Sequence, residues 1–204
     1  KIPTAQTPYA HRAIVTTVIT ETSHKQTAYQ QFLSTGPLAF LPLHDGRSSV
    51  VWSCTTKYFT YLESLENNDF ENAISEATDN RFGRIKMLTR RRSFPLFRLR
   101  AHNYIASRVA LVGDAVHTVH PLAGLGANIG FSDAASLAEV VVDAYKKRRD
   151  IGSYNVLRRY ERWRRSENHL LLNGIDILYS MFNNNDPINL AMRGIGMNIV
   201  DRTS

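Results

Sequence analysis

The sequence predicts an α+β fold, with a β-sheet in the first half of the chain and long helices in the second. Short β-branched or apolar runs separated by turn residues fill residues 1–100, whereas apolar residues recur at helical spacing in the second half. A chain of 204 residues is long enough for one large domain or two small ones whose cores need no disulfide or metal. We therefore expect one domain over residues 1–100 and a second over residues 101–204.

Three runs in the first half are typical of strands, namely residues 12–20, 37–43 and 48–55. Residues 44–47, His-Asp-Gly-Arg, contain the Asp-Gly pair of a tight hairpin. The second and third runs are therefore expected to pair antiparallel. Cys54, the single cysteine, excludes an internal disulfide framework, is consistent with a reducing compartment and is expected to be a small core residue.

One helix and a further extended segment complete the first half. Between residues 65 and 80, apolar residues recur at helical spacing at Phe70, Ala73, Ile74 and Ala77. Residues 84–97 return to extended character, and Pro95 limits this segment to a sheet edge or to the end of a strand. The pattern predicts a sheet with a covering helix.

The second half predicts a short strand followed by helices. Residues 107–113, Ser-Arg-Val-Ala-Leu-Val-Gly, read as a buried strand that ends in glycine. Helices are expected from Ala127 onward and over residues 153–181. A last helix is expected from Pro187 to about residue 200, because proline is favoured in the first turn of a helix.

The periodicity of these helices predicts which face is buried. In the first, the positions expected to face the core are Ala127, Phe131, Ala134, Leu137, Ala138, Val141 and Tyr145, and those expected to face solvent are Asp133, Ser136, Asp143 and Lys147. In the second, the expected core positions are Leu157, Tyr160, Trp163, Leu171, Ile175 and Leu178.

The net charge of +7 comes mostly from basic clusters within residues 90–92, 146–149 and 158–165. Such clusters indicate binding to nucleic acid, binding to an anionic lipid surface, or simply a solvated helix face. Aromatic residues are not interleaved with them, and no zinc-finger or RRM-type pattern occurs, so no nucleic-acid partner is expected. No apolar run of about 18 residues and no charged-then-apolar leader occurs, so neither a spanning helix nor a signal peptide is expected.

The most informative stretch is LVGDAVHTVHPLAGLGANIG, residues 111–130. Its last three glycines have the spacing G-x-G-x-x-x-G and do not follow a strand directly, so they are a poor dinucleotide-binding fingerprint. Gly113 and Asp114 instead place a carboxylate at a strand end, where it accepts hydrogen bonds from ribose-like hydroxyls. Residues 121–126 then lead into a helix N-terminus, whose free N–H groups favour negative charge. The site suits a polyhydroxyl chain attached to a ring that carries partial negative charge.

His117 and His120 lie three residues apart in this stretch. Without further His, Cys or paired carboxylates nearby, no metal site is expected. Hydrogen bonding of these histidines to the backbone is favoured over a proton relay or contact with a cofactor.

GDAVHTVHPLAGLGANIGFSDAASLAE, residues 113–139, closely resembles the second FAD-binding motif of the aromatic-ring flavoprotein monooxygenases, the para-hydroxybenzoate hydroxylase group. Within that group it is most similar to the hydroxylases of ubiquinone biosynthesis. FLSTGPLAFLPL, residues 32–43, and SFPL, residues 93–96, also resemble segments of the substrate domain of those enzymes. The resemblance covers essentially the whole chain. It implies a substrate-binding domain over residues 1–100 and the C-terminal strand and helices of a split Rossmann-like FAD domain over residues 101–204.

The resemblance also implies roles for individual residues. Asp114 would bind the ribityl chain of FAD, and the cofactor-binding set would be Gly113, Asp114, Pro121, Gly124, Gly126, Ala127 and Asn128. The substrate set would be Pro37, Leu38, Phe40 and Phe94, although Phe94 is equally consistent with simple packing. Leu125 stands where these hydroxylases commonly carry glutamine, which puts a side-chain hydrogen bond to the flavin at this position in doubt.

The implied activity is hydroxylation of the aromatic ring of a polyprenylated phenol or benzoquinol, with FAD as cofactor and NAD(P)H and O2 as co-substrates. The cofactor carries the chemistry, so no catalytic side chain and no metal are expected. Two alternatives stay open: a flavin hydroxylase of a small soluble aromatic, and a basic membrane-docking or scaffold module.

The N-terminal βαβ unit of that family, with its glycine-rich loop, does not occur in this sequence. The chain is therefore expected to be a C-terminal portion of a hydroxylase that neither retains FAD nor turns over substrate by itself, and that self-associates. We expect the parent enzyme to be cytoplasmic and peripheral on the inner membrane, close to other proteins of quinone biosynthesis.

Overall fold

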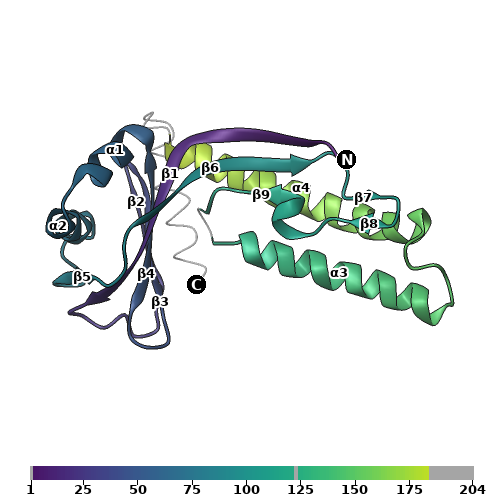
Figure 1. The fold of residues 1–204 in the computed structure, drawn as a ribbon, viewed down its shortest axis with the longest axis horizontal. Coiled ribbons are helices and arrows are strands. Elements are labelled where there is room, and N and C mark those ends of the chain that lie inside the picture. The colour runs from purple at the N-terminus through teal and green to yellow at the C-terminus, as the bar shows by residue number, and fades with distance from the viewer. Residues whose placement is uncertain (1, 122–123, 184–204) are drawn as a thin grey trace, which may run out of the picture. The chain divides into compact units, whose positions relative to one another are not determined.

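The computed structural model describes residues 2–121 and 124–183, and its mixture of an antiparallel sheet with long helices confirms the α+β class (Figure 1). The chain divides into two compact units, which we call the sheet unit (residues 9–96) and the helix unit (residues 2–8 and 97–181). Residues 2–8 belong to the helix unit although residues 4–8 form the start of the first strand, and the His102 N–H donates to the carbonyl of Pro3 at 3.0 Å. The expected last helix, from Pro187, lies outside the described residues.

Antiparallel strands build the sheet unit in the order β2-β3-β4-β1. They are β1 (Thr4–Thr20), β2 (Tyr29–Leu33), β3 (Gly36–Pro42) and β4 (Ser48–Thr55), with β5 (Ile85–Met87) paired to the end of β1. The predicted hairpin between β3 and β4 is confirmed, with Pro42 opposite Ser48. Gly46 has φ +83° in its turn, and the Leu43 N–H donates to the Arg47 carbonyl at 2.8 Å.

Helices α1 (Thr56–Ser64) and α2 (Asn67–Ala77) lie on one face of this sheet (Figure 1). The predicted helix corresponds to α2, whereas α1 was not predicted, because only Phe59 and Leu62 of its nine residues are buried. It follows β4 directly, and the Thr55 hydroxyl caps its first turn by accepting from the Tyr58 N–H.

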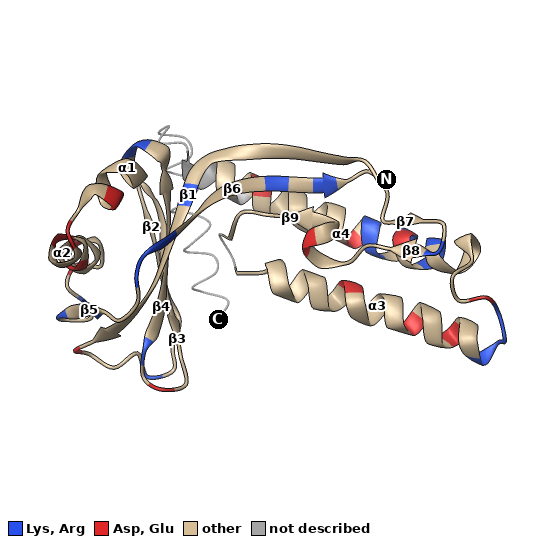
Figure 2. Ribbon diagram, viewed as in Figure 1, with Lys and Arg blue, Asp and Glu red and all other residues tan. Residues whose placement is uncertain are grey.

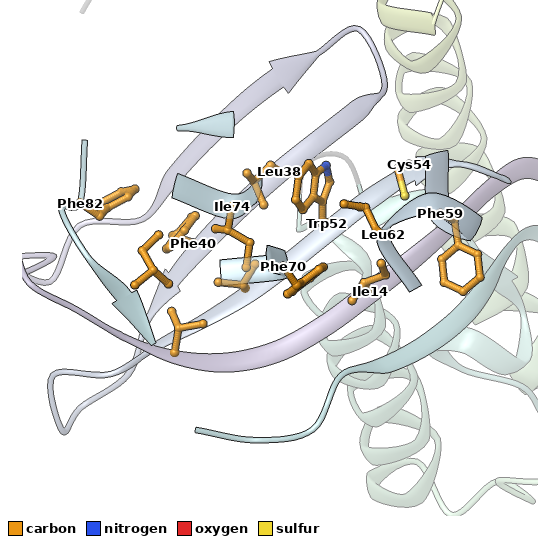
Figure 3. Close-up of a cluster of buried hydrophobic side chains, with 13 residues drawn as sticks. Ile14, Leu38, Phe40, Trp52, Cys54, Phe59, Leu62, Phe70, Ile74 and Phe82 are labelled. Carbon is orange, nitrogen blue, oxygen red and sulfur yellow. The ribbon is translucent and has the colours of Figure 1, made fainter. Parts of the chain in front are cut away.

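The core of the sheet unit lies between these helices and the sheet (Figure 3). Trp52 and Phe70 pack at its centre, and Phe40 stacks on Phe82 with ring centroids 4.5 Å apart. Cys54 is a buried core residue as predicted, and burial raises the pKa of its thiol to about 12.

Strand β6 (Arg92–Ala101) begins in the sheet unit and ends in the helix unit, where its later residues pair antiparallel with β9 (His117–Thr118). Pro95 lies inside β6 rather than at its end, before the two residues that pair with β9. The expected strand over residues 107–113 is wrong. Arg108, at φ +59°, turns the chain between the short strands β7 (Ile105–Ala106) and β8 (Val109–Ala110), and Val109 is 47% exposed.

Both long helices are where the sequence predicted them, as α3 (Gly126–Lys146) and α4 (Tyr154–Asn183), and they run beside each other (Figure 1). The predicted buried face of α3 is wrong. Phe131 and Tyr145 are 73% and 75% exposed, whereas the buried stripe is Ile129, Asp133, Ser136, Val140 and Ala144. The stripe tolerates Asp133 because its carboxylate is fully hydrogen-bonded, as described below.

The buried stripe of α4 is also partly polar. Leu157, Tyr160 and Ile175 are buried as predicted, but Trp163 and Leu171 are exposed, and Arg164 and Asn168 are buried instead. None of the helices in the described part of the chain is both long and apolar enough to cross a bilayer.

In the sheet unit, the backbone at Gly36 leaves no room for a side chain. Gly36 has φ +129°, and a Cβ there would lie 2.1 Å from the Ser53 carbonyl oxygen. We expect Gly36→Ala to destabilise the protein by about 2 to 4 kcal/mol. Gly46→Ala is the matched control, since a Cβ there meets nothing within 4 Å, and its cost should be about 1 kcal/mol. Equal losses in denaturant unfolding would contradict this account.

Candidate functional site

A pocket of about 650 Å³ opens in the helix unit beside the start of α3. Its lining consists of Val112, Gly113, Asp114, Thr118, Val119, Pro121, Gly124, Gly126, Ala127, Gly130, Phe131 and Ala134. Six of the seven residues predicted to bind a cofactor therefore share one pocket. The seventh, Asn128, follows Ala127 in the first turn of α3 and is exposed.

The turn that carries Asp114 is packed directly against α3. Gly113 has φ +58°, a conformation that glycine adopts without strain. A Cβ built on Gly130 would lie 3.3 Å from the Gly113 Cα, so a side chain would crowd this contact. The Val116 N–H donates to the Gly113 carbonyl at 2.8 Å and closes the turn. The Asp114 side chain is exposed at the pocket, where its carboxylate is available to hydroxyl groups.

The buried carboxylate of Asp133 supports this turn from below. Its Oδ2 accepts from the Gly113 N–H at 3.1 Å and lies 2.7 Å from His117 Nε2. Its Oδ1 accepts from Arg164 Nε at 2.8 Å and from Asn168 Nδ2 at 3.0 Å. Because an ionised carboxylate only accepts, His117 donates from Nε2.

Burial by itself would raise the pKa of Asp133, but the donors on its two oxygens outweigh that effect. Hydrogen bonds from His117, Arg164, Asn168 and the Gly113 N–H lower this pKa to about 2. The group is therefore an anion with no exposed surface, paired with the nearly buried Arg164 guanidinium. It fixes the Gly113 turn to both α3 and α4.

This cluster was missed in the sequence, where Asp133 was expected to face solvent. The available signal was on α4. Arg164 and Asn168 stand four residues apart within the apolar stripe that includes Leu157, Tyr160 and Leu172. A basic residue and an amide at buried helical positions require a buried acceptor, and Asp133 is that acceptor.

The start of α3 leaves room and hydrogen-bond donors for a ligand. Leu125 precedes the helix and supplies no side-chain cap to its first N–H groups. Gly124 has φ +61°, and a Cβ built on Gly124 or on Gly126 would meet nothing within 4 Å. The open space beside these glycines, the uncapped helix start and the nearby Asp114 fit the flavin end of FAD.

The two histidines do not line this pocket. His117 is buried and bonded to a side chain, not to the backbone group that the sequence favoured. His120 is also buried, and its ring lies over Tyr179 with centroids 4.8 Å apart. Any influence of either histidine on the pocket is therefore indirect.

The four residues predicted to contact a substrate differ in exposure. Leu38 and Phe40 are core residues of the sheet unit, under α1 and α2, so their side chains have no surface for a ligand (Figure 3). This corrects the prediction for both. Pro37 is half-buried, and Phe94 is exposed. These two keep surface that a ligand could contact.

Comparisons with known proteins agree on one family. Residues 3–171 match the family model described as FAD binding domain. The chain is 36% identical to the 3-demethoxyubiquinol 3-hydroxylase of Escherichia coli (strain K12), over 95% of this chain and 49% of that protein. It is 38% identical to the ubiquinone hydroxylase UbiL of Rhodospirillum rubrum, over 95% of this chain and 45% of that protein. The chain thus spans about half the length of the curated relatives it matches.

A solved structure shows the same fold. The myxobacterial chondrochloren halogenase CndH, described as a variant of FAD-dependent halogenases, superposes with a TM-score of 0.71. The match covers 100% of this chain and 51% of that one, at 14% sequence identity, so it speaks for the fold alone.

The lowered pKa of Asp133 predicts a stability change in acid. In the unfolded chain the pKa of this carboxyl is about 4, so the stability that its ionised form contributes is fully present above that pH. The contribution is lost as pH falls through the folded-state pKa of about 2. The difference in unfolding free energy between wild type and Asp133→Asn should therefore shrink between about pH 4 and pH 2. A difference that stays constant over this range in urea unfolding would contradict the assignment.

Proposed function

The chain belongs to the FAD binding domain family, and from this premise we propose that the full-length protein is a flavin-dependent aromatic hydroxylase of ubiquinone biosynthesis. Its substrate would be the ring of a polyprenylated phenol or benzoquinol, with NAD(P)H and O2 as co-substrates. The observation that carries the proposal is the glycine-lined pocket at the start of α3, with Asp114 at its edge. The names of the relatives support the choice of pathway.

Each group in the pocket has a task toward FAD. Asp114 would accept hydrogen bonds from the ribityl hydroxyls. The N–H groups of Gly126, Ala127 and Asn128 would hold the polar edge of the flavin ring, where the helix dipole favours negative charge. Gly124 and Gly126 leave space for the ring. When bound and reduced, FAD supplies the activation of O2 for insertion of one oxygen atom into the ring of the substrate.

The chain's own contribution is therefore binding, orientation and exclusion of water. Val112, Val119, Phe131 and Ala134 give the pocket apolar walls, which would limit the water beside a bound flavin ring. Of the predicted substrate residues in the sheet unit, Pro37 and Phe94 have accessible surface that a substrate could contact. A small soluble aromatic is the alternative substrate.

The basic residues suit a position beside an anionic surface. Figure 2 shows Lys and Arg at the end of α3 and along α4. Lys147 and Arg159 form exposed ion pairs with Asp143. Arg148, Arg149 and Arg162 are exposed as well. Attraction of this set to anionic lipid would bring the enzyme to a bilayer-resident substrate, at about 1 kcal/mol per basic residue near the surface. Other proteins of quinone biosynthesis are the alternative partners.

Because the pocket residues would contact only part of the cofactor, residues 1–204 alone should hold FAD only weakly. The pocket at the start of α3 would contact only the flavin end of FAD, and the relatives are about twice as long as this chain. The exposed Phe131 and Tyr145 of α3 would favour self-association of the chain in isolation.

Asp114 provides the direct test of cofactor binding. Asp114→Ala in the full-length protein removes a charge-assisted hydrogen-bond acceptor, which is worth about 1.5 to 3 kcal/mol. The dissociation constant for FAD, measured by flavin fluorescence, should therefore rise by about one to two orders of magnitude. Asp114→Asn, which keeps one carbonyl oxygen, should lose less. Unchanged affinity in Asp114→Ala would remove this residue from the site.

The substrate class is tested in cells that lack the full-length protein. A prenylated, under-hydroxylated quinone intermediate should accumulate, and a plasmid copy of the wild-type gene should restore the mature quinone. An Asp114→Ala copy should restore it poorly. A quinone pool that is unchanged by the deletion would rule out the proposed pathway and favour a small soluble aromatic.

A further inference from the structure

We infer that Asp133 is a positioning residue that sets the geometry of the turn presenting Asp114 to the flavin. The inference rests on the proposed function, because the turn has this task only if the pocket takes FAD. Asp133 does not line the pocket and has no exposed surface, so it acts through the turn and not by contact with a ligand.

The two ends of the turn converge on one oxygen atom. Oδ2 of Asp133 receives the Gly113 N–H at 3.1 Å and His117 Nε2 at 2.7 Å. Asp114 lies between these two anchored residues and keeps its side chain exposed on the pocket side. A single carboxylate oxygen thus clamps a five-residue segment, and the direction of the Asp114 side chain depends on that clamp.

The second oxygen ties the clamp to α4. Oδ1 receives Arg164 Nε and Asn168 Nδ2, and Arg164 Nη2 also donates to Asn168 Oδ1 at 2.7 Å. Arg164 is further paired with Glu167. Little more than one turn of α4, residues 164–168, therefore holds a carboxylate that projects from α3, and the network restricts the motion of the Gly113 turn.

Asparagine cannot reproduce this arrangement. Its amide offers one oxygen and one NH2 group. Either the donors of the turn, on Oδ2, or the donors of α4, on Oδ1, would therefore face the NH2 group instead of an acceptor. If the NH2 group faces the turn, the Gly113 N–H loses its acceptor. If it faces α4, Arg164 Nε loses its acceptor, and in either orientation the guanidinium loses its buried counter-charge and keeps only the exposed carboxylate of Glu167. Both outcomes loosen the support of the turn.

The test compares Asp133→Asn with Asp143→Asn in the full-length protein. Asp143 is on the same helix and pairs with Lys147 and Arg159, but its ion pairs are exposed. Loss of one buried charge-assisted bond predicts that Asp133→Asn weakens FAD binding by about tenfold or more. Asp143→Asn should stay within about twofold of wild type. The visible absorption band of the bound flavin should shift in Asp133→Asn alone.

His117 provides the second pair of variants, which also serves if Asp133→Asn fails to fold. His117→Ala removes one donor from Oδ2, whereas His117→Gln keeps an N–H in a similar place. FAD affinity should fall in His117→Ala and recover in His117→Gln. Equal affinities in this pair, or FAD binding and spectra in Asp133→Asn that match Asp143→Asn, would overturn the inference. If wild type itself shows no affinity for FAD, the proposed function fails instead.

Discussion

The helix unit depends on one buried carboxylate that joins three separate segments of the chain. Asp133 projects from α3, receives two donors from α4, and holds the Gly113 turn through a third set of contacts. A buried anion without partners is strongly unfavourable, so α3, α4 and the turn must assemble together for any of them to be stable. The candidate flavin site is a consequence of that assembly, because it places Asp114 beside the glycine-lined start of α3.

The same constraint explains which face of α3 is buried. A stripe that includes Asp133 and Ser136 packs inward, while Phe131 and Tyr145 point to solvent. Hydrophobicity alone favours the opposite rotation of the helix. Hydrogen bonds and the ion pair with Arg164 decide the orientation, since only one rotation brings Asp133 to its four donors. An apolar surface therefore remains beside the pocket, of which Phe131 forms part of the wall.

Local chemistry was sufficient to predict much of the fold. The Asp-Gly turn gave the β3–β4 hairpin, and helical periodicity gave α2, α3 and α4. Errors arose where distant residues decide the outcome. Asp133 is buried because of Arg164 and Asn168, which lie 31 and 35 residues further along the chain. The run at 107–113 is apolar like a strand, but Arg108 turns the chain inside it. At the site, the resemblance to the flavin-binding motif identified the glycines and Asp114, whereas the supporting cluster had no local signal on α3.

We propose that the flavin ring lies at the start of α3, with the hydroxyl groups of its ribityl chain on Asp114. A crystal structure of the full-length protein with FAD tests it most directly. We expect the ribityl hydroxyls within hydrogen-bond distance of the Asp114 carboxylate, the flavin ring against Gly124 and Gly126, and the hydrogen bonds of Asp133 intact beneath the turn. A flavin bound away from residues 113–128, or an Asp114 side chain that turns away from bound FAD, would contradict it.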